Sequence, residues 1–159
     1  MKAGQKYVLD KAYRAESAVI EHLEAITDRH RAEHEVRHVS IDLLQFSRTN
    51  RERLAAAAEQ RGARLGSEDE HREHRRATSD DPTIETVTPL DLLEDLRELF
   101  LRASAVSLDW EMLAQHAQAL HDTELLKLAS QCHPRTLQQI AWANTMLKTS
   151  SPQALASAG

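Results

Sequence analysis

Three side chains have the types and positions that could hold a metal ion. Glu16 lies within a helical pattern of apolar residues, where a carboxylate is costly unless it is paired, hydrogen-bonded or bound to a metal. Glu111 and His133 lie on the flanks of two later apolar patterns. Two carboxylates and one imidazole suit Fe(II), Mn(II) or Zn. The simpler interpretation is structural, with Glu16 hydrogen-bonded to Tyr13, Asn50 or an internal water molecule.

The other motifs that could bind a metal or act in catalysis give weaker evidence for a functional site. His34 and His38 are four residues apart, a spacing that can chelate a metal on an exposed helix face, and Glu35 and His38 form a Glu-x-x-His beside a predicted turn. Cys132 and His133 are adjacent, so on a helix their side chains diverge by about 100° and do not form a nucleophile and base pair. The sequence has no phosphate-binding glycine loop, Gly-x-Ser-x-Gly or Cys-x-x-Cys. We therefore expect no catalytic residues.

The composition indicates a helical protein. The chain has 159 residues with only four glycines and four prolines, too few for the turns of a sandwich or barrel. A net charge of −5 and 4% aromatic residues argue against a nucleic-acid-binding protein. No apolar run is long enough to span a membrane, no signal-peptide core is present, and Cys132 is the single cysteine. We expect a cytoplasmic protein with neither a membrane nor a nucleic-acid partner.

Hydrophobic periodicity predicts an all-α fold in a single domain spanning 1–159. Thr88, Pro89 and Asp91 form a helix-start signal. Pro134 is expected to kink the last helix or to split it at that position. The predicted segments are helices over 5–28, 34–61, 89–121 and 123–148, a crossover linker over 62–88 and a frayed tail over 149–159. No Gly or Pro marks the turn near residues 29–33, so one continuous helix is an alternative to the first two.

Four long amphipathic helices, paired as two hairpins around one long crossover, resemble the ferritin-like (rubrerythrin-like) superfamily. The resemblance implies an antiparallel four-helix bundle with a dinuclear iron or manganese site, built from two Glu and two Glu-x-x-His motifs. With this connectivity Glu16, Glu111 and His133 lie at similar heights along the bundle. The one Glu-x-x-His within a predicted helix, Glu35 to His38, is misplaced for such a site, so the full dimetal ligand set is missing.

These observations predict a non-catalytic binding or scaffold protein that requires no cofactor. It is expected to form a homodimer through Ile41, Leu44 and Leu137, which point away from the predicted core. The alternative is an iron- or manganese-binding oxidoreductase or metal-storage protein with a reduced ligand set. A third hypothesis is a regulatory adaptor that docks through residues 62–87.

Overall fold

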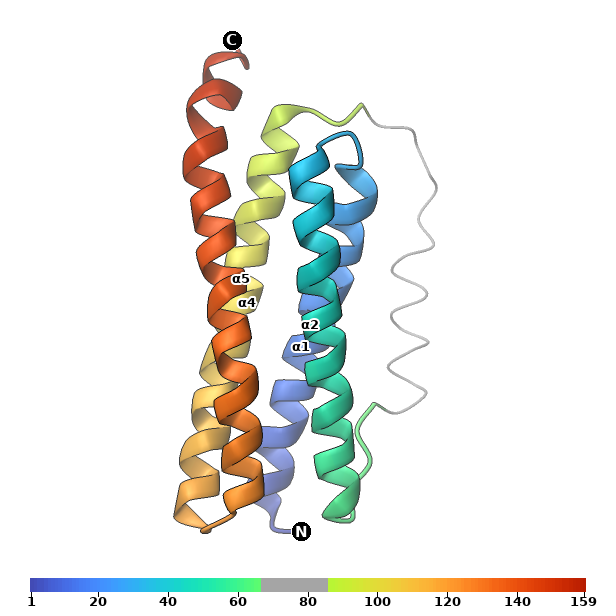
Figure 1. Ribbon diagram of the computed structural model, residues 1–159, viewed down its shortest axis with the longest axis vertical. Coiled ribbons are helices and arrows are strands. Elements are labelled where there is room, and N and C mark those ends of the chain that lie inside the picture. Colours follow the sequence, from blue (N-terminus) through green and yellow to red (C-terminus); the bar gives the residue numbers. More distant parts are fainter. Residues whose placement is uncertain (67–85) are drawn as a thin grey trace.

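The computed structural model describes residues 1–66 and 86–159, and within these ranges the fold is all-α (Figure 1). The helices are α1 (Ala3–Arg29), α2 (His34–Gln60), α4 (Pro89–Ala119) and α5 (Thr123–Ala156). Most of the predicted crossover linker, residues 67–85, lies outside the described residues. None of these four helices combines the length and apolarity needed to cross a lipid bilayer.

Side-chain caps account for the starts of α4 and α5. Thr88 and Asp91 form the expected capping box at the start of α4, with Pro89 as its first residue. The Asp122 carboxylate accepts a hydrogen bond from the backbone of Leu125 and so caps α5. A turn separates α1, which ends at Arg29, from α2, which begins at His34, although this turn contains no Gly or Pro. The alternative of one continuous helix is therefore wrong.

Helix α5 is longer than the sequence predicted. It runs without interruption through Pro134 and Pro152 to Ala156, so the helix is not split at Pro134, one of the two outcomes expected there, and the prediction of a frayed tail from residue 149 is wrong. The fixed φ angle of proline suits a helix, but an interior proline removes one backbone N–H donor and its ring crowds the carbonyl group of residue i−4. Packing outweighs that loss, since residues on both sides of Pro134 are buried and Ala154 is only 6% exposed.

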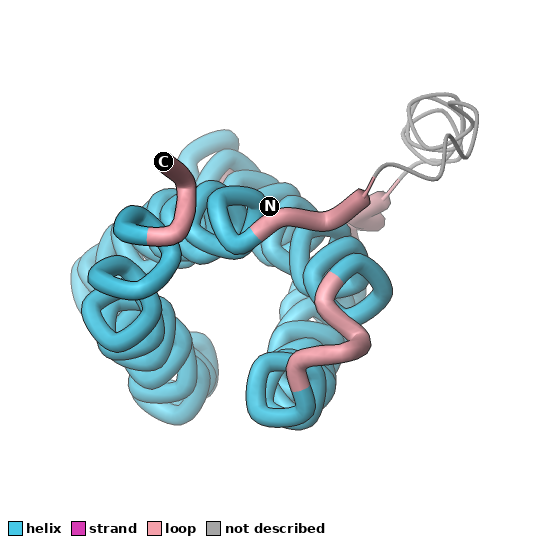
Figure 2. Tube along the Cα trace, turned by 90° about the horizontal axis from the view of Figure 1, so that it is seen from above, coloured by secondary structure: helices cyan, strands magenta, loops and turns pink. Residues whose placement is uncertain are grey.

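The helices form an open arc in the order α2, α1, α4, α5 (Figure 2). In Figure 1, α1 runs upward from the end that holds the N-terminus and α2 runs back down to that end. Helix α4 begins at the top and runs down, and α5 runs upward and extends beyond the other helices. Neighbours within the arc pack extensively, whereas α2 and α5, at its two ends, make the smallest contact. Buried side chains from all four helices nevertheless form one hydrophobic core.

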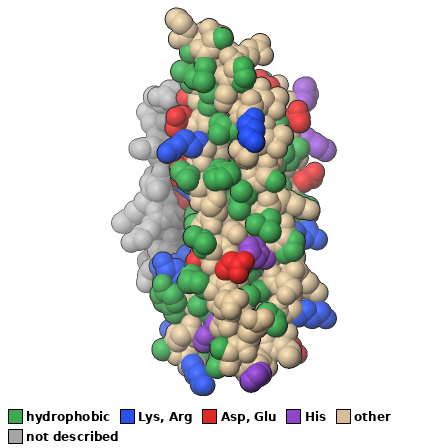
Figure 3. Space-filling model, turned by 90° about the vertical axis from the view of Figure 1, so that its left-hand side faces the viewer, with side chains coloured by type: hydrophobic (Ala, Val, Ile, Leu, Met, Phe, Trp, Pro, Cys, Tyr) green, Lys and Arg blue, Asp and Glu red, His purple; other side chains and the backbone are tan. Residues whose placement is uncertain are grey.

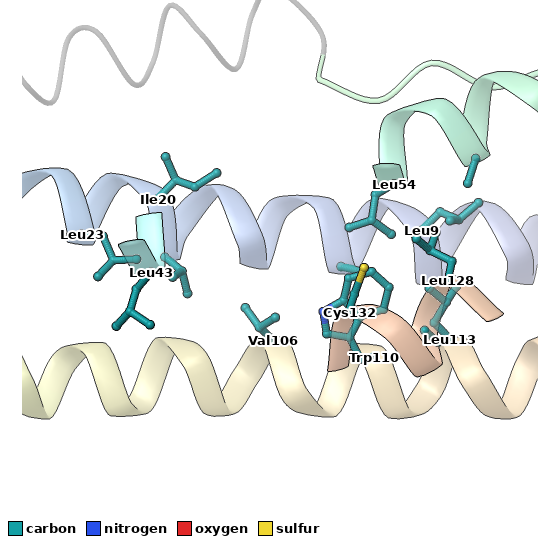
Figure 4. Packing of buried hydrophobic residues seen from close by; sticks show 14 of the residues in the cluster. Leu9, Ile20, Leu23, Leu43, Leu54, Val106, Trp110, Leu113, Leu128 and Cys132 are labelled. Atoms are coloured by element: carbon teal, nitrogen blue, oxygen red, sulfur yellow. The ribbon is translucent and has the colours of Figure 1, made fainter. Parts of the chain in front are cut away.

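This core is mostly aliphatic, with Trp110 as its largest fully buried side chain (Figure 4). Side chains with no exposed surface come from all four helices, including Leu9, Leu54, Leu113 and Cys132. Leu44 was predicted to lie on the surface but is only 7% exposed and belongs to this core. The reason is its position on the flank of α2 that packs against α1, which a helical wheel of α2 alone cannot show.

Candidate functional site

Glu16 on α1 lies at the centre of the core and has no exposed surface. Its Oε1 atom accepts hydrogen bonds from Asn50 Nδ2 on α2 at 3.2 Å and from Trp110 Nε1 on α4 at 3.1 Å. Its Oε2 atom has no hydrogen-bond partner among the described residues. The carboxyl group thus joins three helices through one oxygen and leaves the other unsatisfied.

Burial raises the pKa of Glu16 to about 7, because removing the carboxylate from water disfavours its charged form. Interactions with Asn50, Trp110 and Ser47, and the positive charge of Arg51, lower the pKa only in part. Glu16 therefore changes charge near neutral pH inside the bundle.

The polar layer continues from Glu16 to α5. Gln139 Nε2 donates to Ser47 Oγ at 2.7 Å and to the carbonyl oxygen of Leu43 at 3.1 Å. Gln139 Oε1 and Thr136 Oγ1 are buried and, within residues 1–66 and 86–159, have no hydrogen-bond partner. All four helices therefore contribute to one band of polar side chains across the core.

This band does not fit a dinuclear iron or manganese group. It contains one carboxylate, Glu16, with amide, indole and hydroxyl groups around it, whereas such a group needs several carboxylates and imidazoles. The nearby Cys132 thiol is also a poor ligand, because burial raises its pKa to about 11. In the part of the chain that the structure describes, no three His, Cys, Asp or Glu residues are grouped to hold a metal ion.

The structure pairs two of the three predicted ligands and leaves Glu16 in the core. His133 Nδ1 lies 3.7 Å from Glu111 Oε1, and His133 Nε2 shares a 2.7 Å hydrogen bond with Ser107 Oγ. The side chains of Glu111 and His133 are 58% and 18% exposed, so the pair lies at the outer seam between α4 and α5. His34 and His38 are exposed on α2.

A second buried polar cluster surrounds Asp95 on α4, which the sequence interpretation overlooked. Its carboxylate accepts hydrogen bonds from Arg29 at 2.6 and 2.7 Å and from His30 at 2.6 Å. Burial raises the pKa of Asp95, but the hydrogen bonds from His30 and Arg29 outweigh that effect and hold it below its usual value. The available signal was an acid on the apolar face of the 89–121 pattern, the same signal that singled out Glu16.

The Asp95 cluster borders a pocket of about 550 Å³ at the end of the bundle where α1 ends and α4 begins. Arg29 and His30 line it together with Leu92 and Met146. Arg29 and His30 both bind Asp95, so the cluster links the end of α1 to α4.

No protein-family model, no curated protein and no solved structure matches the chain.

Proposed function

We propose that the protein is a non-catalytic binding or scaffold protein that forms a homodimer through the outer face of α4 and α5. Its connectivity supports an antiparallel, ferritin-like bundle, since the described chain stops after α2 at one end and resumes before α4 at the other (Figure 1). The buried free thiol of Cys132 fits a reducing compartment, and we propose a cytoplasmic location.

The observation that carries this proposal is the lack of charge on the outer face of α4 and α5. Between residues 103 and 119 the only Asp, Glu, Lys or Arg residues are Asp109 and Glu111, and between 128 and 147 the only one is Arg135. Asp109 is only 9% exposed, and Arg135 stacks over the Phe46 ring of α2 at 4.4 Å. Glu111 is therefore the single residue of these four charge types that the two segments present on their shared outer face.

Exposed apolar side chains occupy the same face, which Figure 3 shows from the side of α4 and α5. Leu101, Leu108 and Met112 on α4 are 48%, 66% and 41% exposed, and their spacing of seven and four residues places them on one helical stripe. Leu137 on α5 is 50% exposed. A stripe of this kind on a helix surface is typical of a protein interface.

The outer surface of α1 and α2 has the opposite character. It carries ion pairs between Asp10 and Arg14 at 2.9 Å and between Glu24 and Arg48 at 2.9 Å. Charged residues of this density favour contact with water. This contrast supports the proposal that a partner covers the face formed by α4 and α5.

A second copy of the chain is the partner that this face suits. Two helices of about 10 Å diameter and about 28 Å of uncharged length give a footprint of roughly 560 Å², the same order as the ~800 Å² that each partner contributes to a standard interface. A two-fold interface brings each patch against itself, so it disfavours a strongly charged patch and tolerates a neutral one. The sparse charge of this face meets that condition.

The proposal is tested by light scattering coupled to size-exclusion chromatography at high micromolar concentration. We expect the wild-type chain at twice its mass of 18.0 kDa and the Leu108→Glu variant at 18.0 kDa, with unchanged helix content by circular dichroism. Ile41→Glu is the matched control: the sequence suggested Ile41 as a dimer contact, but this 44% exposed residue lies on α2, outside the face formed by α4 and α5. A monomeric wild type, or a dimer that Ile41→Glu dissociates and Leu108→Glu does not, would contradict the proposal.

A further inference from the structure

Glu111 and His133 lie within the apolar face formed by α4 and α5. Leu108 precedes Glu111 by one helical turn on α4, and Leu137 follows His133 by one turn on α5. The bond between Ser107 Oγ and His133 Nε2 holds the imidazole with its Nδ1 atom toward Glu111 Oε1. One nitrogen and one oxygen donor are thus presented side by side at the surface.

The geometry of this pair is that of half a metal site. Ligands bound at 2.0–2.1 Å to tetrahedral Zn²⁺ lie roughly 3.3 Å from one another. The 3.7 Å separation of His133 Nδ1 and Glu111 Oε1 reaches that value with a small side-chain movement. A metal-binding histidine commonly has its second ring nitrogen hydrogen-bonded by a neighbouring group, which is the arrangement that Ser107 provides.

We propose that two copies of the chain complete a Zn²⁺ site at their interface, with Glu111 and His133 of each copy as the four ligands. This inference rests on the proposed self-association, because one chain supplies only two donors. Two nitrogens and two oxygens at a two-fold axis match the tetrahedral, mixed-donor coordination that Zn²⁺ prefers.

Electrostatics favours the same conclusion. A two-fold axis near this pair brings the Glu111 carboxylates of both copies together in a surface that loses its water on association. Like charges in a desolvated interface repel and are costly to bury. A divalent cation between the carboxylates neutralises them, so Zn²⁺ strengthens the dimer as well as binding to it.

The experiment uses untagged, chelator-stripped protein titrated with ZnCl2, with bound zinc counted by calorimetry and the dimer dissociation constant measured by sedimentation. We expect one Zn²⁺ for every two chains. If only the dimer binds Zn²⁺, zinc stabilises the dimer relative to the monomer. Free Zn²⁺ at about 100 times its own dissociation constant then lowers the dissociation constant of the dimer about 100-fold.

Two variants and one control test His133 as a ligand and Ser107 as the residue that orients it. His133→Ala is expected to abolish stoichiometric Zn²⁺ binding while a weaker, zinc-independent dimer remains. Ser107→Ala is expected to weaken Zn²⁺ binding about 10- to 100-fold, because the imidazole loses the bond that orients it. The control is the double variant His34→Ala, His38→Ala, which removes the exposed histidine pair of α2 and should leave zinc binding unchanged.

The outcomes separate the zinc site from the dimer. A dimer in chelator that neither binds nor responds to Zn²⁺ overturns the zinc site and leaves the proposed function standing. A monomer under all conditions overturns both. One Zn²⁺ per monomer, or binding lost only in the His34 and His38 variant, overturns the shared site.

Discussion

The buried carboxyl group of Glu16 makes a specific prediction about stability and pH. Its pKa is about 7 in the folded protein, compared with an ordinary value of 4.5 in the unfolded chain. Between these two values the folded state holds a proton that the unfolded state has released. The free energy of unfolding therefore falls as pH rises from 4.5 to 7, and the stability present below pH 4.5 is lost above the folded pKa.

The magnitude follows from the size of the shift. At 1.36 kcal/mol for each pKa unit, a rise from 4.5 to about 7 corresponds to about 3 kcal/mol of stability lost by pH 8. Glu16→Gln keeps the acceptor oxygen for Asn50 and Trp110 but has no charge to bury. We expect wild type to lose about 3 kcal/mol relative to Glu16→Gln between pH 4.5 and pH 8.

Urea unfolding followed by circular dichroism at 222 nm from pH 4.5 to 8.5 measures this difference. For an m-value near 2 kcal/mol/M, about 3 kcal/mol moves the relative midpoint by roughly 1.5 M urea. Glu59→Gln is the control, since Glu59 is exposed on α2 and its removal should leave the pH dependence unchanged. Parallel pH profiles for wild type and Glu16→Gln, or a wild type that gains stability over the variant as pH rises, would refute the reasoning.

Three further predictions concern stability measured by urea unfolding at pH 7. Asp95→Asn weakens the bonds to Arg29 and should cost about 2 kcal/mol, a value reduced because Arg29 is 45% exposed. Since the folded pKa of Asp95 is lowered, this contribution should decrease as pH falls below the ordinary 3.8 and should be lost below the folded pKa. Equal loss in the variant at pH 7 and pH 3 would contradict it. Asp122→Ala removes both the cap of α5 and the bonds to Arg61 at 2.9 and 3.0 Å, and should cost about 1–2 kcal/mol, whereas an unchanged midpoint would show that the cap is dispensable. Leu54→Ala opens a cavity at a fully buried position and should cost about 3 kcal/mol; a loss below about 1 kcal/mol would mean that α2 relaxes to fill it.

The sequence predicted correctly those features that depend on one short stretch of chain, such as where a helix lies and where it begins. The capping box at Thr88 and Asp91 fixed the start of α4, and the period of the apolar residues located the helices. The same reasoning failed where it allowed the last helix to split at Pro134 and where it placed a frayed tail from residue 149, because the packing that outweighs the cost of a proline comes from other helices. It also failed at Leu44, whose burial depends on how α1 lies against α2.

For the candidate site too, the sequence predicted some features and the tertiary structure decided the others. The sequence alone showed that Glu16 is a carboxylate on an apolar stripe and that Glu111 and His133 lie on the flanks of theirs. Only the tertiary structure decided that Glu16 bonds to Asn50 and Trp110 in the core while Glu111 and His133 pair on the outside. Helical periodicity gives the direction of a side chain about its own axis. The rotation and spacing of neighbouring helices, which packing sets over the whole bundle, determine which side chains meet.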